Sequence, residues 1–280
     1  MLNSIYNFID LILPFDWLSF TFMKNAFLAI LIVTPLFGIL STMVVSNKMS
    51  FFADSLGHGA FTGIALGILL GGLDPKWGAT LFSICFAIAI TIIKNKGTSS
   101  TDTVIGVFSS TALALGLVLM SYSSNLSKFS SYLVGDLLSI SPSEIILLLG
   151  VLVLVLLLWV FMFNKLLVTS LNASLANSRG TNTLIVEIIF TCTIAVVVTL
   201  TINWVGLLII NSLLVLPAAA ARNISRNIRE YHIYSVLIAI ISGITGLIVS
   251  YYLNTVTGAT IVLISAVFFF ITLILKKKFV

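Results

Sequence analysis

Long apolar stretches joined by short polar connections make up most of this chain. A helix that crosses a bilayer needs about 20 mostly apolar residues, and its backbone must be hydrogen-bonded internally because lipid offers no partners. The pattern therefore predicts an all-α, polytopic helix bundle in a membrane. The expected spanning helices lie at residues 26–46, 53–72, 77–94, 103–121, 143–163, 183–203, 205–221, 232–253 and 258–275.

Residues 205–221 decide how many times the chain crosses. The stretch is just long enough to span as a helix, but Pro217 interrupts its far end because proline has no backbone N–H to donate. It could instead fold back as a short segment buried in protein. We expect nine crossings, with eight as the alternative.

Two other apolar pieces are too interrupted or too short to cross. Asp10, Pro14 and Asp16 break residues 1–23, which we interpret as an N-terminal interfacial segment. Residues 129–141 are too short to span a bilayer alone. The rest of the chain, residues 24–280, is then expected to form a single transmembrane domain.

The basic residues are divided unevenly between the two sets of connections. Cytoplasmic connections carry an excess of lysine and arginine. With nine crossings, eleven of the 14 basic residues fall on one side, and the other side holds Lys24, Lys76 and Lys128. With eight crossings the division is nine to five. The sharper division predicts an N-terminus outside and a C-terminus in the cytoplasm of a bacterial-type cell membrane.

Composition excludes a soluble domain. Only 8% of the residues are charged and 59% are hydrophobic, with a mean hydropathy of +1.20, whereas soluble domains carry about 25% charged residues. The net charge of +5 is explained by basic residues at the cytoplasmic ends of helices. The lipid bilayer is therefore an expected partner and nucleic acid is not.

Several common chemical motifs are missing from the sequence. Cys85 and Cys192 lie inside apolar runs and belong to no C-x-x-C motif, which favours packing residues over a disulfide or zinc site. No G-x-x-x-x-G-K-[ST] sequence occurs, so any ATP hydrolysis that drives this chain belongs to another polypeptide. No H-E-x-x-H sequence occurs either, and an intramembrane enzyme is not favoured.

Asp54 and His58 supply the most distinctive chemistry, within the stretch ADSLGHGAFTGIALGILLGG at residues 53–72. Four residues apart on a helix, their side chains lie on one face about one turn apart. A carboxylate with an imidazole suits Mn2+, Zn2+ or Fe2+ better than Mg2+ or Ca2+, and a two-ligand site can release an ion in transit. The alternative is a hydrogen-bonded pair at the end of a span with no role in transport.

A stripe of glycines follows the same helix on a neighbouring face. It repeats every four residues and consists of Gly59, Gly63, Gly67 and Gly71. Small residues at this spacing let another helix approach closely, so we expect tight helix packing on that face.

Three blocks of the chain carry a resemblance to a known family. The first is ADSLGHGAFTGIALG, similar to the pattern GDAxSHAVLPGVALG. The second is DTVIGVFSSTALALGLVLMS with YLVGDLLSISPSE, and the third is VGLLIINSLLVLPAAAARNISRN with SGITGLIVSYYLNTVTGATIVLISAVFFF. In order and spacing they resemble the ABC-3 family of zinc and manganese uptake permeases, over residues 24–275.

The resemblance implies a type II ABC importer-like fold and the permease subunit of an ATP-driven importer. The implied cargo is a divalent transition metal, Mn2+ or Zn2+ with Fe2+ as a further candidate, and no cofactor is held permanently. The implied partners are a second copy of the chain, a cytoplasmic ABC ATPase dimer that binds ATP, and an extracytoplasmic metal-binding protein. The family's metal-passage residues correspond to Asp54 and His58.

The first block departs from the family pattern at several positions. Ala53 replaces the leading glycine, Gly57 and Gly59 replace the serine and alanine that flank the histidine, and Thr62 replaces a proline. The acid and the imidazole are retained, so these departures bear on the choice of metal more than on the class of protein.

Three further residues are candidates for the translocation pathway. Asn211 and Ser212 place polar groups inside the 205–221 stretch, and Glu187 is an acidic residue near the start of the 183–203 span. Ionisable residues are costly to bury inside a membrane, so a residue of this kind that is found there often has a function. The alternative for Glu187 is a hydrogen-bonded residue at a span boundary.

Residues 218–231 are the best candidate for contact with an ATPase. This stretch follows Pro217, is compatible with a helix and carries Arg222, Arg226 and Arg229. The alternative is that the arginines only follow the positive-inside bias or contact anionic lipid.

Two other transport classes stay open on the sequence. An ion-coupled secondary transporter would be expected to show an internal repeat and acidic residues at mid-span. An ABC permease for an organic metal chelate or vitamin would not require the Asp54–His58 pair.

Overall fold

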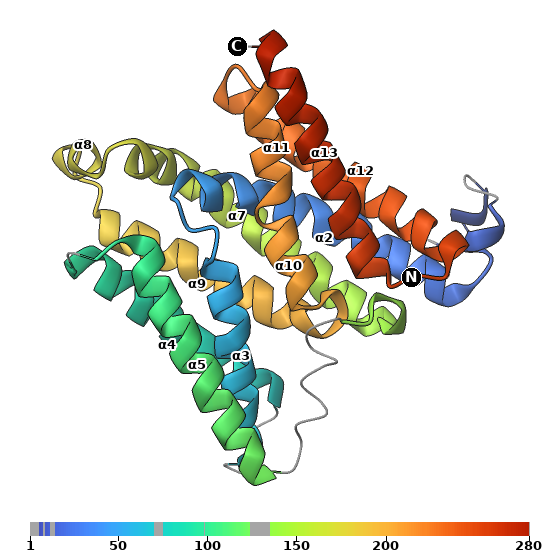
Figure 1. Cartoon of the computed structure of the whole chain (residues 1–280), viewed down its shortest axis with the longest axis horizontal. Helices are drawn as coiled ribbons and strands as arrows, with labels where there is room; N and C mark the ends of the chain where they lie inside the picture. The colour runs from blue at the N-terminus through green and yellow to red at the C-terminus, as the bar shows by residue number, and fades with distance from the viewer. Residues whose placement is uncertain are drawn as a thin grey trace. The chain divides into compact units, whose positions relative to one another are not determined.

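The computed structural model describes residues 6–279 apart from residues 8, 12–14, 70–74, 98 and 124–134. Every regular element in this part of the chain is helical (Figure 1). Two short 3-10 helices lie at Asp16–Leu18 (η1) and Leu137–Ser139 (η2). The α-helices are α2 (Thr21–Ser46), α3 (Phe52–Leu69), α4 (Pro75–Lys96), α5 (Thr101–Ser123), α7 (Pro142–Leu171), α8 (Ala173–Ser178), α9 (Thr183–Val205), α10 (Leu207–Leu213), α11 (Leu216–Ile224), α12 (Ile228–Leu253) and α13 (Thr257–Phe279).

Among the described residues, eight helices are long and apolar enough to cross a membrane. Each overlaps one of the predicted spans, which confirms the all-α membrane bundle. They are α2, α3, α4, α5, α7, α9, α12 and α13. Helix α7 extends beyond its predicted end at residue 163 because its apolar run continues into a further stretch of helix-compatible residues.

The predicted helix at residues 205–221 is not continuous. Gly206 has a φ of 81°, a left-handed conformation that separates α9 from α10. A second interruption at Leu214 and Val215 separates α10 from α11, and Pro217 lies in the first turn of α11, where its missing N–H costs nothing. The predicted span at residues 205–221 is therefore two short helices rather than one, and the described residues contain eight helices long enough to cross, the number that the alternative count gave.

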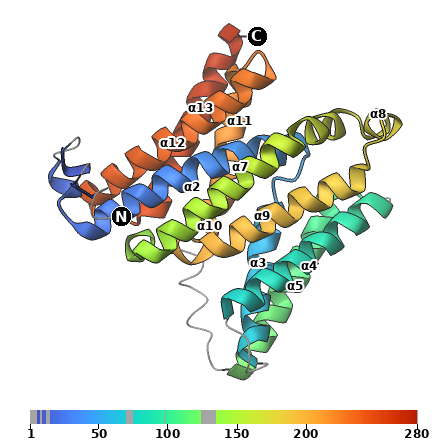
Figure 2. The same cartoon turned by 180° about the vertical axis from the view of Figure 1, so that it is seen from behind.

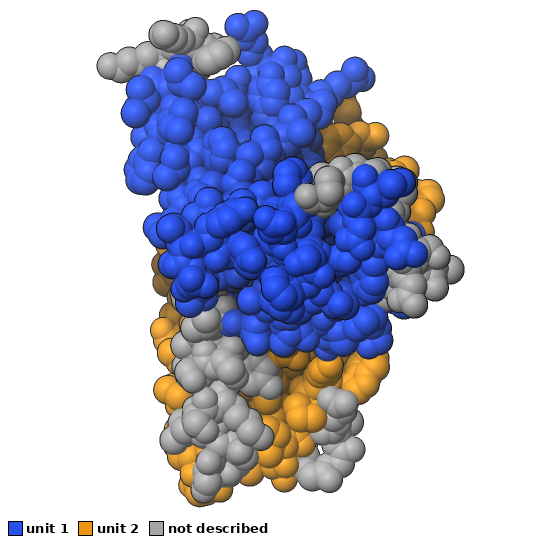
Figure 3. Space-filling model, turned by 90° about the vertical axis from the view of Figure 1, so that its right-hand side faces the viewer, with its two compact units in different colours: residues 1–42, 134–153, 204–280 blue, residues 43–133, 154–203 orange. Residues whose placement is uncertain are grey.

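The chain divides into two compact units, each built from separate stretches of sequence (Figure 3). Unit 1 comprises residues 1–42, 134–153 and 204–280, and unit 2 comprises residues 43–133 and 154–203. Three long helices, α2, α7 and α9, contribute residues to both units.

In unit 1, α2 and α12 run antiparallel and almost in backbone contact (Figures 1 and 2). A Cβ atom added at Gly38 would lie 2.8 Å from the Cα atom of Val236. Nearby, the buried hydroxyls of Ser41 and Ser235 lie 3.0 Å apart. Small residues thus allow the close approach, and paired hydroxyls satisfy the polar groups that it buries.

One end of unit 1, here called end A, gathers the starts of several helices. Asn25, near the start of α2, donates through Nδ2 to the Ile140 carbonyl just before α7, at 3.2 Å. A single pocket at this end is lined by Asp136, by Trp204 and Ile209 around the α9–α10 break, and by residues 255–258 between α12 and α13.

The opposite end of unit 1, end B, gathers the ends of α2, α11 and α13 and the start of α12. The Tyr231 hydroxyl donates to the Thr42 carbonyl at 3.3 Å, which joins the start of α12 to α2. Asn223 Nδ2 lies 3.4 Å from Thr272 Oγ1, which joins the end of α11 to α13. The broken pair α10–α11 therefore runs from end A to end B.

In unit 2, α3 lies between α4 and α5. On one side, a Cβ atom added at Gly63 would lie 2.6 Å from the carbonyl oxygen of Gly78 in α4. On the other side, Thr62 Oγ1 donates to the Ala112 carbonyl of α5 at 2.6 Å. Helix α3 is thus fixed on two flanks, and the residues at its start occupy a defined position within this unit.

Candidate functional site

Asp54 and His58 occupy successive turns at the start of α3 and face each other. Asp54 Oδ2 lies 3.5 Å from His58 Nε2, and the side chains are 41% and 16% exposed. Asp54 is in the first turn of α3, where the positive end of the helix dipole favours a carboxylate. The local fold therefore presents an anion and an imidazole together at a half-exposed position.

The separation of the two donor atoms is suited to a shared metal ion. Protein nitrogen and oxygen ligands bind Zn2+ at about 2.1 Å, so two ligands at a tetrahedral angle stand about 3.4 Å apart. The observed 3.5 Å between Asp54 Oδ2 and His58 Nε2 requires little rearrangement to reach that geometry.

In the described part of the chain, Asp54 and His58 form a pair rather than a group of three metal-binding side chains. Within the described ranges, no group of three or more His, Cys, Asp and Glu residues is close enough to hold a metal. In the same part of the chain, the buried Nδ1 atom of His58 has no hydrogen-bond partner. One copy of the chain thus offers two ligands, and the imidazole is not fixed by an acceptor behind it.

The glycine stripe lies on the side of α3 that faces α4. A Cβ atom added at Gly59 would lie 3.1 Å from the ring of Phe86, and Gly67 lies close to Gly78. Together with Gly63, these positions leave no room for side chains between the two helices. Gly71, the fourth predicted member of the stripe, lies outside the described residues.

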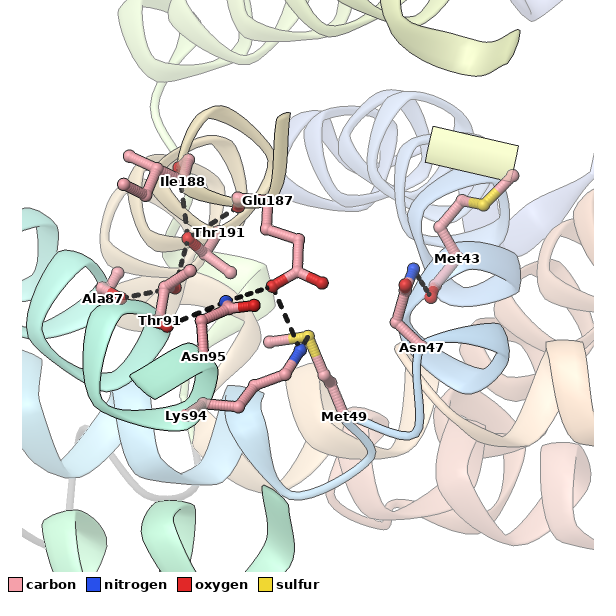
Figure 4. Close-up of polar contacts among 10 residues, drawn as sticks. All are labelled: Met43, Asn47, Met49, Ala87, Thr91, Lys94, Asn95, Glu187, Ile188 and Thr191. Carbon is pink, nitrogen blue, oxygen red and sulfur yellow. Dashed lines mark hydrogen bonds and ion pairs between the residues drawn. The ribbon is translucent and has the colours of Figure 1, made fainter. Parts of the chain in front are cut away.

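Glu187, the predicted pathway acid, is part of a partly buried polar cluster between α4 and α9 (Figure 4). Its Oε2 atom accepts from Lys94 Nζ at 3.3 Å and from Asn95 Nδ2 at 2.7 Å. The Lys94 and Glu187 side chains are 14% and 13% exposed. One turn further along, the hydroxyls of Thr91 and Thr191 lie 3.0 Å apart. The carboxylate is thus engaged by two donors that hold two helices together.

Sequence reasoning missed the partners of Glu187. Lys94 was counted only as a cytoplasmic charge, and Asn95 was not considered. The available signal was a pair of i, i+4 polar positions in each helix, Thr91 with Asn95 and Glu187 with Thr191, inside otherwise apolar segments. Such rows mark faces that contact each other rather than lipid.

The other candidate residues belong to unit 1. Asn211 and Ser212 are half-buried on the short helix α10. Arg222, at the end of α11, and Arg226 and Arg229, around the start of α12, are exposed at end B. The structure brings Asp54 and His58 together in unit 2, and it places these five residues in the other unit.

Comparison with known proteins assigns the chain to a family. The sequence profile described as the ABC 3 transport family matches residues 19–276, which include all eight long helices. The chain belongs to the ABC 3 transport family. It is accordingly a membrane transport protein and not an enzyme, as the absence of catalytic motifs in the sequence predicted.

Individual members of the ABC 3 transport family are similar along most of their length. The zinc uptake membrane protein ZnuB of Haemophilus influenzae is 32% identical over 85% of this chain and 92% of its own. The manganese import permease ScaB of Streptococcus parasanguinis is 30% identical over 93% and 92%. The solved structure of PsaBC from Streptococcus pneumoniae, in complex with Fab, matches with a TM-score of 0.79 and 28% identity over 97% and 95%.

Proposed function

We propose that this chain is the permease subunit of an ATP-driven importer for a divalent transition metal, Mn2+ or Zn2+, with Fe2+ as a further candidate. The relatives named for zinc or manganese uptake support this cargo class. The observation that carries the proposal is the Asp54–His58 pair, whose 3.5 Å separation suits two ligands of one metal ion.

Two copies of the chain would complete the site. One copy offers a carboxylate and an imidazole, and Zn2+ is usually held by four ligands. A homodimer with its two-fold axis near α3 would bring two Asp54 and two His58 side chains to one ion. The ion would exchange part of its water shell for these ligands and leave readily, because each half-site is weak.

The packing of unit 1 supports an outside N-terminus and a cytoplasmic C-terminus. Helices α2, α13 and the pair α10–α11 all run from end A to end B, and α12 runs back. If each long helix crosses, the chain reaches end A before α10 and end B before α12. The broken pair α10–α11 then makes the ninth crossing as two short helices, which is possible because it is buried in protein rather than exposed to lipid.

The distribution of charge supports end B of unit 1 as the cytoplasmic end. The charged residues described at end A are mostly acidic: Asp10, Asp16, Lys24, Asp136 and Glu144. Those described at end B are mostly basic: Arg222, Arg226, Arg229, Glu230 and Lys276. Basic residues gather on the cytoplasmic side, so the C-terminus lies there and the start of α2 lies outside.

The connection between α11 and α12 is the proposed contact with a cytoplasmic ABC ATPase dimer. Ser225 ends α11, and Asn227 caps α12 by accepting from the Glu230 backbone N–H at 2.9 Å. Glu230 in turn accepts from the Arg226 backbone N–H at 2.8 Å. These hydrogen bonds fix the turn against the start of α12, and it exposes Arg222, Arg226 and Arg229 at end B.

An extracytoplasmic metal-binding protein is the proposed source of the ion, delivered at the end of the permease that contains the start of α2.

The engagement of Glu187 by Lys94 and Asn95 speaks against an ion-coupled secondary transporter, because such a mechanism needs a membrane acid free to bind and release its coupling ion.

Uptake of radiolabelled Zn2+ and Mn2+ tests the proposal. The permease would be reconstituted in proteoliposomes with its ATPase and delivery protein, and Asp54→Ala and His58→Ala compared with wild type. Loss of a group that supports a metal ligand lowers metal affinity or activity roughly 10–100-fold. We expect loss of the ligand itself to lower uptake by at least that factor in each variant. Asp102→Ala, an exposed carboxylate in the first turn of α5, is the matched control and should transport normally.

The alternatives predict different results from the same experiment. Unchanged uptake in both the Asp54 and His58 variants would make the pair structural, whereas wild-type protein that takes up neither metal would favour an organic chelate as cargo. ATP-independent uptake that follows an ion gradient would favour a secondary transporter.

A further inference from the structure

Thr62 lies one turn after His58 on the same face of α3, the helix that carries the Asp54–His58 pair. Its side chain contacts both the backbone of α3 and the neighbouring helix α5. The Thr62 hydroxyl lies 2.6 Å from the Ala112 carbonyl of α5 and 3.1 Å from the His58 carbonyl. The residue is 1% exposed. A buried hydroxyl therefore connects the turn that carries His58 to the adjacent helix.

The bond to α5 is the stronger of the two contacts. A hydroxyl carries one hydrogen, and 2.6 Å is at the short end of the range for such bonds, whereas 3.1 Å is beyond it. The hydrogen is thus directed mainly at Ala112. Since the contact joins two helices, its loss would let α3 shift or rotate relative to α5.

Helix α5 is shaped to receive Thr62. A Cβ atom added at Gly116 would lie 3.0 Å from Thr62 Oγ1 and 2.7 Å from Cδ1 of Phe61. Glycine at this position lets α5 come close enough for the hydroxyl to reach the Ala112 carbonyl, one turn earlier in α5. The contact between the two helices is therefore specific to these residues.

The type of residue at position 62 also determines whether the His58 carbonyl has a backbone hydrogen-bond donor. In the pattern GDAxSHAVLPGVALG the corresponding residue is proline, which would remove the N–H that bonds the carbonyl four residues earlier and would kink the helix. In this chain Thr62 lies within the continuous helix α3, so its backbone N–H remains available to the His58 carbonyl while its hydroxyl bonds Ala112. The turn that carries His58 is thereby held straight.

We propose that Thr62 is a positioning residue that fixes His58 against α5 and thereby favours Zn2+ over Mn2+ at the Asp54–His58 site. This proposal rests on the proposed metal-transport function. Imidazole is a preferred ligand of Zn2+, whereas Mn2+ is well served by carboxylate and water. A misplaced imidazole consequently weakens Zn2+ binding more than Mn2+ binding.

Equilibrium dialysis with radiolabelled Zn2+ and Mn2+ tests this proposal on the importer complex in nanodiscs without the delivery protein. Thr62→Val keeps the shape and removes the hydroxyl. We expect its Kd for Zn2+ to rise about threefold, the factor that corresponds to one average hydrogen bond between membrane helices, with a smaller change for Mn2+. Thr62→Ser, which retains a hydroxyl, should restore the wild-type ratio of the two Kd values.

Thr80→Val is the matched control, because Thr80 is also buried on a helix and bonds only a carbonyl of its own helix among its described contacts, that of Lys76 at 2.8 Å. An unchanged Kd ratio in an assembled Thr62→Val complex, an equal change in Thr80→Val, or no recovery in Thr62→Ser would each overturn the proposal. If Thr62→Val does not assemble, Gly116→Ala disturbs the contact from α5 and must shift the ratio in the same direction. Wild-type complex that binds and transports neither metal would instead overturn the proposed function itself.

Discussion

Unit 2 contains two acid–base pairs that are built in opposite ways. Asp54 and His58 come from successive turns of one helix, with 41% and 16% of their side chains exposed. Lys94 and Glu187 come from different helices and are only 14% and 13% exposed. Asn95 adds a further donor to Glu187, whereas the buried Nδ1 atom of His58 has no partner among the described residues.

The difference shows how the same kinds of group serve either binding or architecture. A buried ion pair is tolerated only when its members are well paired, because removing charges from water is costly. The Lys94–Glu187 cluster meets that condition and joins α4 to α9. The Asp54–His58 pair is more exposed, and His58 Nδ1 has no partner among the described residues, so the pair can accept a metal ion at a lower cost in desolvation.

The substitution His58→Lys should have the largest effect on this comparison. It would place a permanent cation beside Asp54. The pair would become a salt bridge like Lys94–Glu187 and would no longer offer an imidazole to a metal ion. We expect metal uptake to fall by on the order of 100-fold, with the fold retained because oppositely charged i, i+4 pairs are mildly stabilising. Uptake in proteoliposomes and size-exclusion chromatography measure the two effects. Uptake above a tenth of wild type would mean that the pair is not in the ion's path.

The substitution Glu187→Gln should have the next largest effect, on stability. It leaves the Lys94 ammonium buried without its counter-charge, which costs about 3 kcal/mol of unfolding free energy. Adding Lys94→Met should recover most of this loss, since an apolar side chain needs no partner. Unfolding by SDS titration measures both variants. A Glu187→Gln protein of normal stability that loses metal uptake would assign Glu187 to the pathway after all.

The substitution Thr91→Val should have the smallest effect. It removes the hydroxyl contact with Thr191 between α4 and α9, and hydrogen bonds between membrane helices average about 0.6 kcal/mol. Thr193→Val is the control, because Thr193 is half-buried and its hydroxyl donates to the Ile189 carbonyl of its own helix. The same SDS titration should separate the two variants, and equal stabilities would show that the Thr91–Thr191 contact adds nothing to the ion pair beside it.

Much of the candidate site could be predicted from the sequence because it is local. Asp54 and His58 are four residues apart, so a helix brings them to one face whatever surrounds it. The orientation of Thr62 toward Ala112 could not be predicted, because the partner lies 50 residues away. The engagement of Glu187 by Lys94 and Asn95 escaped prediction for the same reason, since it depends on how α4 meets α9.

Hydrophobic pattern alone predicted that this protein is a bundle of membrane helices, and it located eight of them. Hydropathy suffices for that purpose because lipid forces each apolar segment to satisfy its own backbone. The form of residues 205–221 became clear only from the folded chain, where Gly206 and the interruption before Pro217 produce two short helices. That outcome depends on neighbouring helices that bury the interrupted backbone. The sequence of the segment alone does not show whether such neighbours are present.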